Sequence, residues 1–159
     1  MVSLLPMTEA HLDSIEELEA QIFGIGKWSR GMFQSELEAP ARHYRVAHAE
    51  AVGVVGYAGV FLGESSQVMT IGVAPQWQRR GIGASLLADL IQAAREWGAK
   101  EMLLEVRVDA HPPQAMYKSF GFRRVGIRKN YYQAEGVDAL VMHKQLRKGP
   151  GPIGSEVTA

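Results

Sequence analysis

A short glycine-rich segment, from Val73 to Ala84, carries the residues whose types and spacing could bind an anion. An apolar run ends there at a proline, and apolar residues resume at helical spacing after Gly83. Gly81 and Gly83 let the backbone turn tightly and bring its N–H groups close to a ligand. Because the first amides of a helix lack partners within it, this segment suits a pyrophosphate group. Arg79 and Arg80 add positive charge beside it.

The spacing of these residues separates the known classes of phosphate-binding loop. A Walker loop needs Lys and then Ser or Thr after its last glycine, but Ala84 follows Gly83. A dinucleotide-binding fingerprint needs a third glycine where this chain has Leu86. The pattern that fits is Val-x-Pro followed by Gln-x-x-Gly-x-Gly-Ala, which resembles the acetyl-CoA-binding segment of the GCN5-related N-acetyltransferases. The alternative is a glycine-rich turn that binds no ligand.

This resemblance implies that acetyl-CoA is the cosubstrate and that main-chain groups do most of the binding. The residues concerned are Ile71, Gly72, Val73, Gln78, Arg79, Arg80, Gly81, Ile82, Gly83 and Ala84. The first three end the strand before the loop. A main-chain N–H there would donate to the carbonyl oxygen that becomes negatively charged during transfer.

A second resemblance, to the bacterial ribosomal-protein-alanine N-acetyltransferases of the RimI type, rests on three segments. These are residues 104–107, residues 115–122 and the Asn-Tyr-Tyr segment 128–132, supported by a Trp28-Ser29 turn. The resemblance implies that the acceptor is the N-terminal amine of an alanine on a small-subunit ribosomal protein. It places this peptide end in a groove between two loops.

The loops concerned are the glycine-rich connection 23–28 and the segment 128–136. The candidate substrate-binding residues are Phe23, Ile25, Trp28, Tyr131 and Tyr132. From the residues alone, the Phe and Trp of the first loop either pack in the core or line a substrate groove. Because aromatic rings are hard to keep in water, the core is the favoured interpretation.

The resemblance also implies the catalytic groups. Glu105 would be the general base that removes a proton from the amine, and Tyr117 the general acid that protonates the leaving thiolate. An α-amino group, with a pKa near 8, needs only modest help at neutral pH. Other readings remain open, because Glu105 could form an ion pair with Arg107 or Arg128, and Tyr117 could be a core aromatic.

One position departs from the family pattern. Ala110 stands where the family usually has Asn, which contacts the pantetheine arm. Either Asp109 or His111 compensates, or CoA is held less tightly. His111 precedes two prolines and is more simply explained as an exposed turn residue.

The elements that must position these residues follow from hydrophobic periodicity. Their order resembles that of the acetyltransferase fold, and this resemblance implies an α/β (α+β) single-domain GNAT fold, with a mixed central sheet of about seven strands flanked by about four helices. Strands are predicted at 2–5, 43–49, 52–62, 67–73, 102–108, 122–127 and 139–145. Helices are predicted after Thr8, Ser29, Gly83 and Pro112. The domain would span residues 1–148, and the Gly- and Pro-rich tail 149–159 should be disordered.

The composition argues against several classes of partner and cofactor. The formal net charge is zero, which argues against nucleic-acid binding, and the chain has no Cys for a disulfide, a thiolate metal site or a nucleophile. The five histidines show no metal-ligand spacing, so we expect no metal. No signal peptide or membrane-spanning run is apparent. We therefore expect a cytoplasmic monomer that does not bind membranes.

Two other functions fit the same sequence. The fold could acetylate a small amine, such as a polyamine or an antibiotic, although this usually needs an acidic pocket. Acidic residues gather in the first 50 positions, largely on predicted helix faces that point to solvent. Alternatively, the chain could be a non-catalytic acetyl-CoA-binding module that regulates a partner, but the presence of both Glu105 and Tyr117 argues against this.

Overall fold

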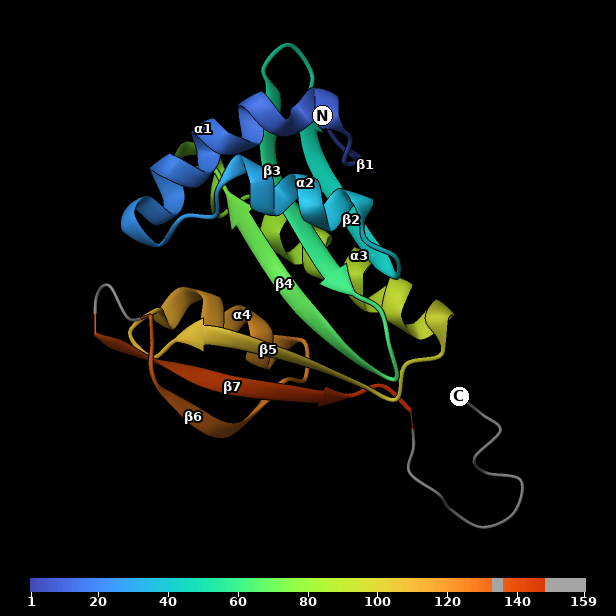
Figure 1. The fold of residues 1–159 in the computed structure, drawn as a ribbon, viewed down its shortest axis with the longest axis vertical. Helices are drawn as coiled ribbons and strands as arrows, with labels where there is room; N and C mark the ends of the chain where they lie inside the picture. The colour runs from blue at the N-terminus through green and yellow to red at the C-terminus, as the bar shows by residue number, and fades with distance from the viewer. Residues whose placement is uncertain (133–135, 148–159) are drawn as a thin grey trace. The chain divides into compact units, whose positions relative to one another are not determined.

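The computed structural model describes residues 1–132 and 136–147, which form seven strands and four α-helices (Figure 1). The strands are β1 Val2–Pro6, β2 Arg42–Ala49, β3 Gly53–Phe61, β4 Ser65–Val73, β5 Glu101–Arg107, β6 Arg123–Tyr132 and β7 Val137–Gln145. The helices are α1 Leu12–Phe23, α2 Arg30–Glu38, α3 Ile82–Trp97 and α4 His111–Ser119. The hydrogen-bonded strand order is β1-β2-β3-β4-β5-β7-β6, and β4 pairs with β5 in parallel. The predicted order of elements and the mixed sheet are confirmed.

The chain forms two compact units. The N-terminal unit comprises Met1–Phe61 and Met69–Ile91, and the C-terminal unit comprises Leu62–Val68 and the chain from Gln92 onward. Strand β4 and helix α3 each begin in one unit and end in the other. The two units are described separately below.

The core of the N-terminal unit is built on one face of α1. Apolar side chains recur there at helical spacing, and Ser29 caps α2 by accepting a hydrogen bond from the N–H of Met32 (3.2 Å). Phe33 on α2 is almost fully buried, which stabilises the fold by about 1.5–3 kcal/mol. The buried core residues are Met7, Leu12, Ile15, Leu18, Phe33, Tyr44, Val46, Tyr57 and Ala74.

A glycine makes room for one of these core rings. Tyr44 on β2 lies opposite Gly59 on β3, and a Cβ added at Gly59 would overlap the ring carbons of Tyr44. The Tyr44 hydroxyl donates to Oε1 of Glu36 (2.6 Å). Burial, followed by the negative charge of Glu36, raises the pKa of Tyr44 far above its ordinary value.

The C-terminal unit is organised around β5. Its side chains alternate, with Met102, Leu104 and Val106 buried and the residues between them half-buried. Strand β7 pairs antiparallel with both β5 and β6, and β4 enters this unit in the register Ser65↔Glu101 to Gln67↔Leu103. This alternation directs Glu105 away from the apolar face of the strand.

Several predicted boundaries differ from the structure, most of all at the end of β6. Strand β6 continues to Tyr132, although the sequence analysis ended it at Ile127 and placed residues 128–136 in a connection. Asn130 has φ 50° and its N–H donates to Oδ1 of Asp138 (2.8 Å), so β6 resumes pairing with β7 after an irregularity. Strand β4 begins at Ser65 rather than at the predicted Gln67.

Two further expectations concern the C-terminal tail and membrane-spanning helices. The predicted tail, residues 149–159, lies outside the described residues. Among the helices of the described part, none has the length and apolar character needed to cross a membrane.

Candidate active site

The glycine-rich loop of the N-terminal unit has the backbone of an anion cradle. Arg79 has φ 64° and Gly81 has φ 81°, so left-handed residues alternate with others just before α3. The first hydrogen bond into α3 runs from the N–H of Ser85 to the carbonyl of Gly81 (3.0 Å). The N–H groups of residues 82–84 therefore precede the helical ladder and can bind an anion. The unusual conformation predicted for Gly81 is confirmed, whereas Gly83 has no positive φ and lies inside the helix.

The side chains of this loop mainly hold its shape. Gln78 donates through Nε2 to the carbonyl of Val73 (3.2 Å), which ties the loop to the end of β4. The guanidinium of Arg80 lies over the ring of Trp77, 4.4 Å from its centroid, and donates to the carbonyl of Gln76 (3.4 Å). The guanidinium of Arg80 is therefore engaged within the loop itself.

The end of β4 packs against Tyr57 of β3. A Cβ added at Gly72 would lie 2.9 Å from the hydroxyl oxygen of Tyr57 and 3.1 Å from Cδ1 of Ile22. Just after the strand, the N–H of Ala74 donates to the carbonyl of Val55 (2.8 Å). The segment Ile71–Val73, predicted to contact acetyl-CoA, is thus held closely against its own unit.

A buried carboxylate that the sequence analysis missed lies beneath this strand. Glu19 on α1 is 1% exposed; its Oε2 accepts the N–H of Trp28 (2.7 Å), and its Oε1 accepts the hydroxyl of Tyr57. Burial raises the pKa of Glu19, and the hydrogen bonds from Tyr57 and Trp28 partly oppose the rise. The sequence did contain a signal, because Glu19 falls four residues after Ile15 and three before Ile22, on the apolar face of the helix.

The first candidate substrate loop divides between core and surface. Trp28 packs on the core with its ring 5.0 Å from that of Phe33, so the core interpretation is confirmed for it. Phe23 is 40% exposed, so the core interpretation is wrong for this residue. Gly24, with φ 56°, ends α1, and Ile25 lies in the single 3₁₀ turn Gly24–Gly26.

The candidate base lies in the C-terminal unit and is held by two side chains. Oε1 of Glu105 accepts a hydrogen bond from Nε2 of Gln67 (2.9 Å), and Oε2 accepts one from Nη1 of Arg128 (2.6 Å). The side chain of Glu105 is 14% exposed and that of Arg128 is 56% exposed. Of the two ion pairs considered from the sequence, the one with Arg128 is present. Gln67 was missed, since one polar residue in an alternating strand carries no distinctive signal.

The other predicted site residues of this unit are tyrosines. The ring of Tyr131 lies under the guanidinium of Arg128, 4.6 Å from centroid to carbon. Burial raises the pKa of Tyr131, and the charge of Glu105 adds to the rise. Tyr117 on α4 is 5% exposed and packs edge-on against Phe122 at 5.9 Å. Tyr132 ends β6, and its side chain lies outside the described part of the chain.

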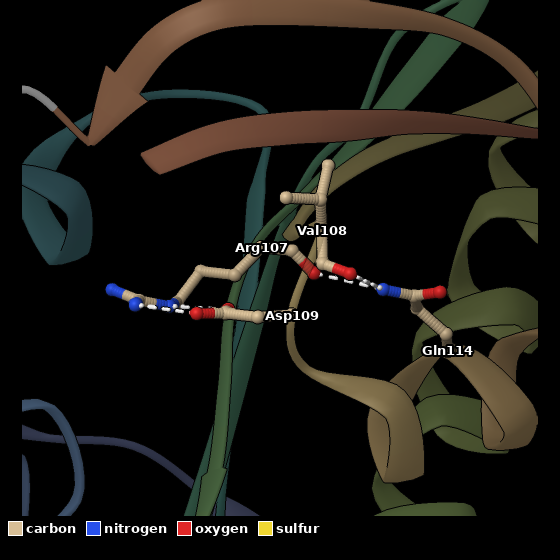
Figure 2. Close-up of polar contacts among 4 residues, drawn as sticks. All are labelled: Arg107, Val108, Asp109 and Gln114. Atoms are coloured by element: carbon tan, nitrogen blue, oxygen red, sulfur yellow. Dashed lines mark hydrogen bonds and ion pairs between the residues drawn. The ribbon is translucent and has the colours of Figure 1, made fainter. Parts of the chain in front are cut away.

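Hydrogen bonds hold the segment around Ala110, the position that departs from the family pattern. Figure 2 shows Arg107 bound to Asp109 through two hydrogen bonds of 3.0 Å each, and Gln114 donating to the carbonyls of Arg107 (2.9 Å) and Val108 (3.0 Å). The Arg107 guanidinium holds the pKa of Asp109 below its ordinary value. The Asp109 carboxylate is therefore already engaged within the segment, and Gln114 fixes the start of α4 to the end of β5.

The predicted site residues thus form two groups. The loop 78–84, the strand end Ile71–Val73 and the turn 23–28 belong to the N-terminal unit. Glu105, Tyr117 and the tyrosines of β6 belong to the C-terminal unit. Within the second group, Arg128 brings Glu105 and Tyr131 together.

Comparison with known proteins identifies the family of this chain. Residues 12–122 match the model of the acetyltransferase (GNAT) family. The chain is 41% identical over 149 residues to the N-alpha-acetyltransferase RimI of Mycobacterium tuberculosis, covering 90% of this chain and 92% of that one.

Two solved structures share the fold. One is the ribosomal-protein-alanine N-acetyltransferase of Escherichia coli, with a TM-score of 0.84 and 24% identity over 96% of this chain and 99% of that one. The other is a GNAT family acetyltransferase of Elizabethkingia anophelis with acetyl-CoA bound. Its TM-score is 0.74 and its identity 20%, and the match covers 91% of this chain and 98% of that one. The chain therefore belongs to the acetyltransferase (GNAT) family and is an acetyl-transferring enzyme.

Proposed function

We propose that this enzyme transfers an acetyl group from acetyl-CoA to the N-terminal amine of a protein, with alanine as the first residue. The observation that carries the proposal is the 41% identity, over nearly the whole chain, to a protein named as an N-alpha-acetyltransferase. The solved structure from Escherichia coli is named for the alanine of a ribosomal protein. We accordingly propose a ribosomal acceptor, a cytoplasmic monomer and an acetyltransferase domain that spans residues 1–148.

The loop of the N-terminal unit fits the pyrophosphate of acetyl-CoA. Its left-handed residues Arg79 and Gly81 lead into α3, where the amides of residues 82–84 precede the helical ladder and can donate to an anion. Acetyl-CoA, when bound, supplies an acetyl group activated as a thioester. The main chain of Ile71–Val73 would donate a hydrogen bond to the carbonyl oxygen under attack.

Glu105 and Tyr117 would manage the protons. The Glu105 carboxylate accepts a proton from the acceptor's ammonium group, and Gln67 and Arg128 fix its orientation. Tyr117, with its ring buried against Phe122, would supply a proton to the departing sulfur. An α-amine costs roughly 3 kcal/mol less to deprotonate than a Lys side chain, because their reference pKa values differ by about 2.5 units. This difference favours the peptide end over an internal Lys.

The test uses one peptide that offers both amines. We expect a peptide with an N-terminal Ala and an internal Lys to be acetylated at its N-terminus, as read by fragmentation in a mass spectrometer. The same peptide with a blocked N-terminus is the matched control and should remain unmodified. Acetylation mainly on the Lys, or faster acetylation of spermidine than of any peptide, would overturn the N-terminal assignment in favour of a small-amine acceptor.

A further inference from the structure

The buried carboxylate of Glu19 joins three segments of the N-terminal unit. One oxygen accepts the main-chain N–H of Trp28, and the other accepts the hydroxyl of Tyr57 on β3. Glu19 is 1% exposed and Tyr57 is fully buried. A carboxylate removed from water in this way is costly unless each oxygen has a partner, and here each oxygen has one.

The two partners of Glu19 lead to different parts of the proposed site. Trp28 follows the turn Gly24–Gly26, at whose start Phe23 is exposed. Tyr57 packs behind Gly72, where an added Cβ would lie 2.9 Å from its hydroxyl oxygen. Glu19 therefore connects the turn on the acceptor side to the strand end on the acetyl-CoA side. It does so by hydrogen bonds to a main-chain amide and to a rigid ring, neither of which can adjust freely.

We propose that Glu19 is a positioning residue for the acceptor: through Trp28 and Tyr57 it fixes the turn 23–28 relative to the strand end at Gly72. This inference rests on the proposed peptide acceptor. Glu19 is too deeply buried to touch a substrate, so its effect reaches the acceptor only through the turn. Loss of the connection should loosen the turn and weaken acceptor binding, while the loop 78–84 keeps its own backbone contacts.

The chain provides a matched pair of variants. Tyr57→Phe removes one hydroxyl that donates to a buried carboxylate on α1. Tyr44→Phe removes a hydroxyl of the same kind, from a buried ring in the same unit, that donates to Glu36 on α2 (2.6 Å). Both variants lose a hydrogen bond to a carboxylate, but only the first touches the connection to Trp28. A purely structural role would give the two variants similar kinetics.

We expect Tyr57→Phe to raise the KM for an N-terminal Ala peptide by about tenfold or more. The KM for acetyl-CoA and kcat should each stay within about twofold of wild type. Tyr44→Phe should leave all three constants within the same range. Glu19→Gln, whose amide can accept from Trp28 and donate to the Tyr57 oxygen, should retain most of the affinity that Glu19→Leu loses.

A second readout does not depend on turnover. Hydrogen exchange at the Trp28 amide, followed by NMR, should be faster in Glu19→Leu and Tyr57→Phe than in wild type or Tyr44→Phe. An unchanged peptide KM in folded Tyr57→Phe, or an equal rise in Tyr44→Phe, overturns the positioning role. Failure of the wild-type enzyme to acetylate any peptide would instead refute the proposed function, and the exchange measurement would still test the connection.

Discussion

A valine at position 81 should separate acetyl-CoA binding from folding. Gly81 has φ +81°, and a Cβ built there meets nothing within 4 Å, so Gly81→Val introduces no clash with the rest of the protein. It does place a β-branched residue in the left-handed region, which costs roughly 1–2 kcal/mol or more. The loop can relieve this strain by turning to negative φ, but its amides then point away from the anion position.

The loss of acetyl-CoA affinity depends on the free energy needed to return the loop to its left-handed conformation on binding. A penalty of about 1–2 kcal/mol corresponds to roughly 5- to 30-fold weaker binding, and each lost amide contact adds to it, so the affinity should fall by at least this factor. Gly81→Asn, which tolerates the left-handed conformation, should bind with intermediate affinity. Isothermal calorimetry with acetyl-CoA measures each value, and thermal unfolding measures each stability.

The other end of α3 supplies the control. Gly98 has φ +95° with nothing within 4 Å of an added Cβ, so Gly98→Val carries the same strain in equally open surroundings. It should lose as much stability as Gly81→Val and bind acetyl-CoA as wild type does. If Gly81→Val binds acetyl-CoA as tightly as Gly98→Val does, the assignment of the loop to pyrophosphate is incorrect.

Two further predictions concern groups that exchange protons. Glu105→Gln and Tyr117→Phe should each lower turnover by roughly 100-fold, with acetyl-CoA affinity nearly unchanged, as measured by steady-state kinetics and calorimetry; full activity of Glu105→Gln at neutral pH would move the base elsewhere. Because burial raises the pKa of Glu19 above its ordinary 4.5, its contribution to stability is complete below that pH and is lost as pH rises through the raised value. The stability of wild type relative to Glu19→Gln should therefore fall in denaturant titrations as the pH rises above 4.5 through the raised pKa, and a constant difference would contradict the shift.

The strands and helices with strong periodicity could be predicted from the sequence. Helix α3 could be predicted from the apolar spacing after Gly83, and Gly98, with φ +95°, directly follows its last residue. The second half of β6 was missed, because residues 128–131 are polar or aromatic and all exposed, so neither face shows an apolar alternation. Pairing with β7, rather than burial, makes this segment a strand, and pairing partners are not visible in a single sequence.

The residue types of the candidate site could be predicted from the sequence, but the hydrogen bonds between these residues could not. The loop 78–84 carries a spacing that only a few backbone conformations satisfy, so its sequence was informative. Glu19 was hidden among neighbouring acidic residues on an amphipathic helix, where a solvated face is the usual explanation. The contact of Gln67 with Glu105 joins two strands that are distant in sequence. Such contacts depend on strand register, which local patterns do not encode.

The fit between Tyr44 and Gly59 limits the order in which this protein can accumulate mutations. With Tyr44 in place, any side chain at position 59 would overlap the ring, so that position is closed to substitution. A smaller residue at position 44 leaves a cavity, which lowers stability but opens position 59. If the two sites change one after the other, position 44 must therefore change first, through the less stable variant that contains the cavity. Libraries that vary one position at a time will miss this route, whereas paired libraries at 44 and 59 can reach repacked cores.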